Sequence, residues 1–209
     1  MIANFIDGLI EYQLLQNALF SSVIVGIVSG IIGRFIILRG MSLMGDAISH
    51  AVLPGVAVSY MMGMNFMIGA SIFGMVAAGL IGFVTQKSKI KSDTSIGIVF
   101  SSFFALGIIL ISFAESSTDL NHILFGNVLA VRPSDLYTTI GVAVAVILFV
   151  ALFYKELLVS SFDPVMAQAY GLKVQVIHYA LMFFLTLVAV SSLQTVGTVL
   201  VIAMLVTQA

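Results

Sequence analysis

Five long stretches of the chain contain no Asp, Glu, Lys or Arg, and they constrain its fold more than any other feature. These stretches are residues 12–33, 47–86, 94–114, 136–154 and 174–209. A helix needs roughly 20 apolar residues to cross the hydrocarbon core of a bilayer, so each stretch can supply at least one span. Because 61% of the residues are hydrophobic and only 8% are charged, a soluble domain is excluded. The chain is therefore expected to be an integral membrane protein.

Two of these stretches are long enough for two helices, so each must fold back once. We place the turns at "MMGMN", residues 61–65, and at "SSLQ", residues 191–194, which gives about seven spans. A β-barrel would show short alternating segments with polar turns, and the sequence has none. The predicted fold is all-α, a polytopic transmembrane helical bundle. Because the chain ends inside an apolar run at Ala209, we expect further sequence to follow.

The basic residues are predicted to fall on one side of this bundle. Only Arg132 lies on the other side; the remaining basic residues are Arg34, Arg39, Lys87, Lys89, Lys91, Lys155 and Lys173. Cytoplasmic loops of membrane proteins carry such an excess of Lys and Arg. Residues 34–46, 85–95 and 155–175 are thus predicted to be cytoplasmic, and the N-terminus to lie outside the cell.

Composition also limits the possible functions. The chain has no cysteine, so disulfides and thiolate metal sites are excluded. Its net charge of -1 argues against nucleic acid as a partner. Neither HExxH nor GxxxxGK[ST] occurs, so the sequence predicts neither a zinc protease nor an ATP-hydrolysing site. The chain is therefore not expected to be an enzyme.

The stretch "GMSLMGDAISHAVLPG", residues 40–55, places ionisable residues in an apolar helix, which indicates function. Asp46 and His50 are four residues apart, so their Cβ atoms should lie about 5–6 Å apart on one helix face. Pro54 has no N–H, so the carbonyl of His50 loses its usual helical partner and can face an ion. These oxygen and nitrogen ligands suit Mn²⁺, Fe²⁺ or Zn²⁺ better than Cu⁺. We therefore predict that Asp46 and His50 bind a metal.

One Asp and one His are too few ligands for a transition metal. If two copies of the chain met along this helix, a two-fold axis would supply two of each residue. A simpler interpretation is that Asp46 caps a helix beginning at Ala47 and that His50 donates to a neighbouring carbonyl. The residues alone leave both interpretations open.

Further polar residues lie on the predicted outer side. Glu115, Asp119 and His122 are spaced i, i+4 and i+7 and could attract cations to an outer mouth, although an acidic solvated loop explains them equally well. The adjoining residues 120–131 are too few for a span and have the length of a re-entrant or interfacial segment.

The predicted cytoplasmic loop 155–175 has the pattern of a short amphipathic helix. Asp163 is a predicted N-cap, Pro164 stands at the first helical position, and Gly171 is a predicted C-terminal stop.

Four blocks of sequence carry a family resemblance: "LRGMSLMGDAISHAVLPGVA" (38–57), "IKSDTSIGIVFSSFFALGIIL" (90–110), "STDLNHILFGNVLAV" (117–131) and "VGTVLVIAMLVT" (196–207). They resemble the permease subunits of bacterial ATP-binding cassette importers for manganese, zinc and iron(II), and the chain is most similar to the manganese permeases. The resemblance runs along essentially the whole chain. One departure is Gln208, in "VTQA", where such permeases usually read "VTPA".

This resemblance implies an assembly in the bacterial plasma membrane. Residues 1–209 would form a single transmembrane permease domain, multi-pass and homodimeric, that works with two cytoplasmic ATPase subunits and an extracytoplasmic metal-binding lipoprotein. It implies that Asp46 and His50 lie on the metal path and that residues 120–131 belong to an outer gate. The loop 155–175 would contact the ATPase, with the residues Phe162, Asp163, Val165, Met166 and Gly171.

The expected function is ATP-driven import of a divalent metal, above all Mn²⁺, by alternating access, with the metal as cargo and no permanently bound cofactor. Zinc or iron(II) import by the same kind of permease stays open, because Asp and His bind all three metals. An ion-coupled secondary carrier is the other alternative, but no inverted repeat of broken helices is evident.

Overall fold

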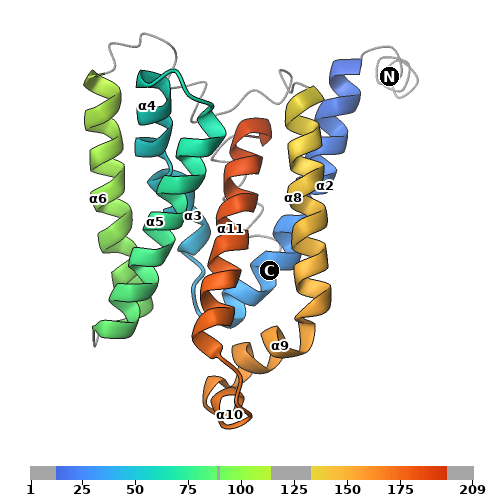
Figure 1. Ribbon diagram of the computed structural model, residues 1–209, viewed down its shortest axis with the longest axis vertical. Coiled ribbons are helices and arrows are strands. Elements are labelled where there is room, and N and C mark those ends of the chain that lie inside the picture. The colour runs from blue at the N-terminus through green and yellow to red at the C-terminus, as the bar shows by residue number, and fades with distance from the viewer. Residues whose placement is uncertain (1–12, 89, 114–132, 197–209) are drawn as a thin grey trace, which may run out of the picture.

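The computed structural model describes residues 13–88, 90–113 and 133–196, which fold into helices joined by short connections (Figure 1). Within these ranges no strand occurs, which confirms the predicted all-α class. The helices are α2 (Gln13–Leu38), α3 (Met44–Ala51), α4 (Leu53–Met61), α5 (Phe66–Lys87), α6 (Ser92–Phe113), α8 (Pro133–Leu152), α9 (Tyr154–Phe162), α10 (Pro164–Ala169) and α11 (Val174–Val196).

Five of these helices are long and apolar enough to cross a membrane. Their apolar segments are Leu15–Leu38 of α2, Phe66–Lys87 of α5, Ser92–Phe113 of α6, Asp135–Leu152 of α8 and Val174–Leu193 of α11. In the apolar segment of α11, 56% of the residues are buried, compared with 17% in α6 and 22% in α8. α11 is therefore the most enclosed of the five, while α6 and α8 present apolar faces that lipid or another protein must cover.

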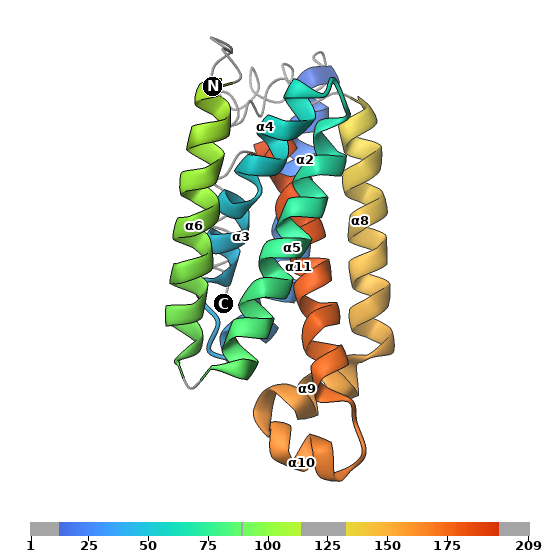
Figure 2. The same ribbon diagram turned by 60° about the vertical axis from the view of Figure 1, so that its left-hand side comes forward.

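A further crossing is built from two short helices. α3 and α4 follow one another with only Val52 between them, and both pack against α6. Pro54, in the first turn of α4, has no N–H to offer the preceding turn, which explains why the helix is interrupted just before it. Figures 1 and 2 show α3 and α4 lying roughly end to end beside α5 and α6.

The helix ends that carry basic residues lie together, as the sequence predicts. Figure 1 shows the end of α2, the connection from α5 to α6, and the helices α9 and α10 at one end of the bundle. Arg39, Lys87, Lys91, Lys155 and Lys173 belong to these segments. Under the positive-inside rule, this is the end that we expect to face the cytoplasm. In Figure 2, α10 projects beyond the ends of α5 and α6.

The predicted turn at residues 61–65 is confirmed. Gly63 has a φ of 64°, in the left-handed region that favours glycine. Asn65 is the N-cap of α5, and its side chain accepts a hydrogen bond from the Met67 N–H at 3.0 Å. The chain therefore turns back directly from α4 into α5.

α4 and α5 then pack with their backbones in contact. A Cβ atom added at Gly55 would overlap the backbone carbonyl of Gly69, and one added at Gly69 would overlap the Ser59 hydroxyl. Only glycine at these positions lets the two helices approach so closely, as is common in lipid, where van der Waals contact drives helix association. Gly69 belongs to the stretch "GASIFG", residues 69–74.

The predicted turn at residues 191–194 is wrong, because α11 continues through it to Val196. Ser191 and Ser192 are buried, and the Ser191 hydroxyl donates to Thr139 Oγ1 of α8 at 3.1 Å. These serines therefore belong to the interior of the bundle, and "SSLQ" contains no glycine or proline to end a helix. Residues 197–209, which were to form the span after this turn, lie outside the described residues.

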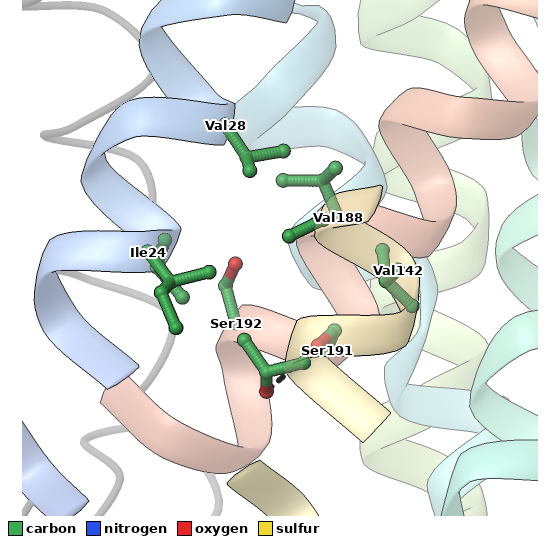
Figure 3. Close-up of a pocket in the computed structure, with 9 residues that line it drawn as sticks. Ile24, Val28, Val142, Val188, Ser191 and Ser192 are labelled. Carbon is green, nitrogen blue, oxygen red and sulfur yellow. Dashed lines mark hydrogen bonds between the residues drawn. The ribbon is translucent and has the colours of Figure 1, made fainter. Parts of the chain in front are cut away.

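A small cavity lies beside these serines, between α2, α8 and α11 (Figure 3). Its volume is about 10 Å³, roughly that needed for one water molecule. Its lining is mostly apolar and includes Ile24, Val28, Val142 and Val188. Ser191 and Ser192 thus serve packing between helices.

Candidate metal site

Asp46 and His50 lie one turn apart on α3 and face each other, as the spacing predicts. The Nε2 atom of His50 is 3.3 Å from Oδ1 of Asp46. The side chains are 22% exposed for His50 and 39% exposed for Asp46, so both remain accessible from one side. The broken helix therefore presents a carboxylate and an imidazole together inside the membrane-spanning part of the bundle.

Two phenylalanines of α6 enclose the His50 ring. The ring centroids of Phe100 and Phe104 lie 5.5 Å and 5.4 Å from the imidazole, each in an edge-on arrangement. The two phenyl rings also stack on each other at 5.7 Å. Such contacts restrict rotation of the imidazole, so α6 helps to keep Nε2 directed at Asp46. The i, i+4 spacing of these phenylalanines was the signal in the sequence that could have identified them.

The other ring nitrogen of His50, Nδ1, is buried and has no hydrogen-bond partner. A buried polar atom without a partner costs on the order of 1–3 kcal/mol. The predicted alternative, in which His50 merely donates to a neighbouring carbonyl, finds no support in these contacts. A neutral imidazole has one nitrogen with a free lone pair, which a metal can use.

The alternative interpretation of Asp46 as a helix cap is wrong. α3 begins at Met44, three residues earlier than that interpretation assumed. The N-cap is Leu43, and no side chain makes a capping hydrogen bond there. Asp46 lies in the first turn, where the helix dipole favours a negative charge, and its Oδ1 faces His50.

The distance between His50 Nε2 and Asp46 Oδ1 would allow both atoms to bind the same cation. With bonds of about 2.1 Å, two ligands of a tetrahedral zinc ion lie about 3.4 Å apart. Neighbouring ligands of an octahedral ion with bonds of about 2.1 Å are about 3.0 Å apart. The observed 3.3 Å between Nε2 and Oδ1 falls between these values.

The described part of one chain does not complete such a site. Within the described ranges, no three His, Cys, Asp or Glu side chains come together closely enough to hold a metal. Asp46 and His50 are therefore two candidate ligands, and a metal site here would need a further contribution. The predicted mouth residues Glu115, Asp119 and His122 lie outside the described residues, as does the segment 120–131.

The predicted cytoplasmic loop forms α9 and α10, joined at Asp163. The Asp163 carboxylate accepts hydrogen bonds from the backbone N–H groups of Val165 at 3.0 Å and Met166 at 2.9 Å, so it is the N-cap of α10. Pro164 stands in the first turn, and Gly171, with a φ of 80°, follows the end of the helix. The predicted start and stop of this helix are both confirmed.

The apolar residues around α10 are exposed. Phe162 is 69% exposed, Val165 76% and Met166 49%. Tyr170, at 70%, extends the same surface and was missed by sequence reasoning, although it stands four residues after Met166. α10 projects beyond the ends of α5 and α6 (Figure 2), so these exposed apolar side chains make the projecting end a candidate interaction surface.

A family model described as the ABC 3 transport family matches residues 11–209. The manganese transport system membrane protein MntC of Listeria monocytogenes is 74% identical over 98% of this chain and 73% of its own length. The manganese import system permease protein ScaB of Streptococcus parasanguinis is 60% identical over 100% of this chain and 75% of its own length.

A solved structure is also similar. It is described as PsaBC from Streptococcus pneumoniae in complex with Fab, and it matches with a TM-score of 0.87 and 59% sequence identity. The match covers 99% of this chain and 75% of that chain. The helical arrangement of the described residues is thus similar to that of a solved structure with closely related sequence.

Proposed function

Because the chain belongs to the ABC 3 transport family, we propose that it is the membrane-spanning permease of an ATP-binding cassette importer that carries Mn²⁺ into the cell. Relatives named as a manganese transport system membrane protein and a manganese import system permease protein, at 74% and 60% identity, support this cargo. The observation that carries the mechanism is the pair of Asp46 and His50, directed at each other within the bundle. Residues 1–209 act as one transmembrane permease domain.

The metal site is completed by a second copy of the chain. A homodimer with α3 near its two-fold axis supplies two carboxylates and two imidazoles. The two negative charges offset the charge of a divalent cation where water is scarce. The exposure of 39% at Asp46 leaves room for such an approach. Mn²⁺ passes through this site as cargo, and no permanently bound cofactor is needed.

Transport energy comes from a separate ATPase. No phosphate-binding GxxxxGK[ST] occurs in the chain, so it is not itself the hydrolysing subunit. The ATPase docks on the exposed apolar surface of Phe162, Val165, Met166 and Tyr170. An extracytoplasmic metal-binding lipoprotein delivers the ion to the opposite end, near the mouth predicted from Glu115, Asp119 and His122.

The decisive experiment measures uptake of Mn²⁺, Zn²⁺ and Fe²⁺ by vesicles that contain the full-length permease, its ATPase and its binding protein. We expect ATP-dependent uptake of Mn²⁺, which Asp46→Asn and His50→Ala each reduce to background while the protein still inserts and dimerises. The Asn variant keeps the shape of Asp46 but removes its charge. Val144→Ala is the control, because Val144 lies on α8 away from this pair and is 59% exposed.

Three outcomes would contradict parts of this proposal. Near-normal uptake by Asp46→Asn would show that the carboxylate charge is not required. Preferential uptake of Zn²⁺ or Fe²⁺ would keep the importer but change its cargo. Uptake that needs an ion gradient instead of ATP would identify a secondary carrier.

A further inference from the structure

Arg39 occupies the short connection between α2 and α3, at the cytoplasmic end of the bundle. Gly40 follows with a φ of 68°, and the backbone N–H of Met41 bonds to the Ile36 carbonyl at 3.1 Å, closing the end of α2. The Met44 N–H then bonds to the Met41 carbonyl at 3.0 Å, at the start of α3. The backbone from Arg39 to α3 is thus a tight, hydrogen-bonded turn with little freedom to absorb a displacement.

The Arg39 guanidinium bonds to two elements that are distant in sequence. Its Nη2 donates to Ser160 Oγ at 2.7 Å and its Nε to Ser161 Oγ at 3.1 Å, both in the last turn of α9. Its Nη1 lies 3.3 Å from His178 Nδ1 of α11. One side chain therefore joins the connection before α3 to α9 and α11.

The two serine hydroxyls are held in place from the other side. Ser160 and Ser161 both donate to the carbonyl of Leu157, at 3.2 Å and 2.7 Å, and Leu157 is fully buried. Their oxygens therefore accept from Arg39 in fixed positions. Only Asp163 separates α9 from α10, so a displacement of α10 reaches these serines within one helical turn.

Open space lies beside this cluster. A cavity of about 480 Å³ is lined by Arg39, Ser160, Ser161 and His178, and also by Pro164 and Gln168 of α10. α10 thus borders this space on one side, while its Ala167 is fully buried. None of the residues lining the cavity is acidic, and no described carboxylate forms an ion pair with Arg39. The position of the Arg39 guanidinium therefore depends on its hydrogen bonds to neutral groups.

We propose that Arg39 is a positioning residue for transport, which passes movement of α9 and α10 to α3 and so to Asp46 and His50. This inference rests on the proposed function, because it assumes that the ATPase docks at α10 and that the metal binds at α3. Arg39 itself touches no metal. Its planar fork of donors holds both serines of α9 at once, which a lysine cannot do in the same geometry.

The test compares Arg39→Gln with Arg34→Gln in the full-length permease, reconstituted with its ATPase and binding protein. Arg34 is the matched control: it lies on α2, carries the same charge and also touches α9, with its guanidinium 5.7 Å from the Tyr154 ring centroid. It makes no hydrogen bond to the α9 serines. The readouts are Mn²⁺ bound to the permease, ATP hydrolysed and Mn²⁺ transported per ATP.

We expect Arg39→Gln to bind Mn²⁺ and support ATP hydrolysis normally, yet to transport about tenfold less Mn²⁺ per ATP, the factor for losing one charge-assisted hydrogen bond. Arg34→Gln should keep the wild-type ratio. Arg39→Lys should give a ratio of Mn²⁺ transported per ATP between those of the wild type and Arg39→Gln, because lysine keeps the charge but lacks the planar fork of donors. The pair Ser160→Ala and Ser161→Ala should lower the ratio in the same direction, and adding Arg39→Gln should lower it little further.

The proposal is overturned if Arg39→Gln and Arg34→Gln give equal ratios, or if the serine and arginine effects add fully. If Arg39→Gln also loses thermal stability, the serine variants, which remove only hydroxyls, decide the matter: a wild-type ratio of Mn²⁺ transported per ATP in those variants overturns the proposal. Failure of the proposed function would look different, because the wild-type complex would transport no Mn²⁺ or Asp46→Asn would transport it normally.

Discussion

The Asp163 carboxylate accepts a hydrogen bond of 2.9 Å from the backbone N–H of Met166, and this bond fixes where α10 begins. Because α10 has only six residues, from Pro164 to Ala169, its own backbone hydrogen bonds contribute little, and the cap carries much of its stability.

Asp163→Ala should therefore loosen α10. Losing such a cap costs about 1 kcal/mol, which should appear as faster hydrogen exchange at the amides of α10 and weaker binding of the ATPase. Asp163→Ser keeps an oxygen that can accept from the same amides, so it should restore most of the protection. Equal exchange in the Ala and Ser variants would show that the cap does not hold this helix.

Val165→Asp should disrupt the docking surface. Val165 is 76% exposed and stands among apolar side chains, so a carboxylate there would be desolvated on binding without a partner. We expect lower affinity for the ATPase and fewer Mn²⁺ ions transported per ATP, with Mn²⁺ binding unchanged. Ile90→Asp, at the same end of the bundle and 39% exposed, is the control. If both variants couple normally, the ATPase contacts another surface.

Gly69→Leu should separate α4 from α5. A side chain at Gly69 would overlap the Ser59 hydroxyl and the Gly55 backbone, so the helices must move apart at a cost of about 1–3 kcal/mol. The melting temperature of the purified protein should fall. Gly79→Leu on the same helix is the control, because a Cβ there meets nothing within 4 Å. Equal melting temperatures for the two variants would refute this close packing.

Asp46→Glu separates charge from geometry at the metal site. It keeps the negative charge but moves the carboxylate by one methylene, away from the 3.3 Å contact with His50. We expect partial uptake with a changed preference among Mn²⁺, Zn²⁺ and Fe²⁺, since these ions differ in preferred coordination. Competition uptake with pairs of metals measures this. An unchanged preference would mean that Asp46 contributes charge without selecting the ion.

The sequence predicts those parts of this fold that depend on local chemistry. Asp163 and Gly171 define α10 because caps and left-handed glycines act within a few residues. Asp46 and His50 share a face because helical spacing alone brings them together. The predicted turn at Ser191 and Ser192 was wrong, because two adjacent serines resemble a turn in sequence, whereas here the surrounding helices bury them.

Contacts between distant segments could not be derived from one sequence. Arg39 and Ser160 are 121 residues apart, and no local sequence pattern near either residue predicts their hydrogen bond. The start of α3 was misplaced for a related reason. Met44 is fully buried, and packing there begins the helix three residues before Ala47 without a capping side chain.

The interruption at Val52 gives one membrane crossing two mechanical parts. α4 packs against α5 through glycine backbones in contact. α3 follows the turn that begins at Arg39 and packs through its side chains against α5, α6 and α11. Asp46 and His50 lie on α3, so both belong to the half of the crossing that is joined to the Arg39 turn. We expect a change of angle at Val52 to reorient the two side chains together without separating α4 from α5.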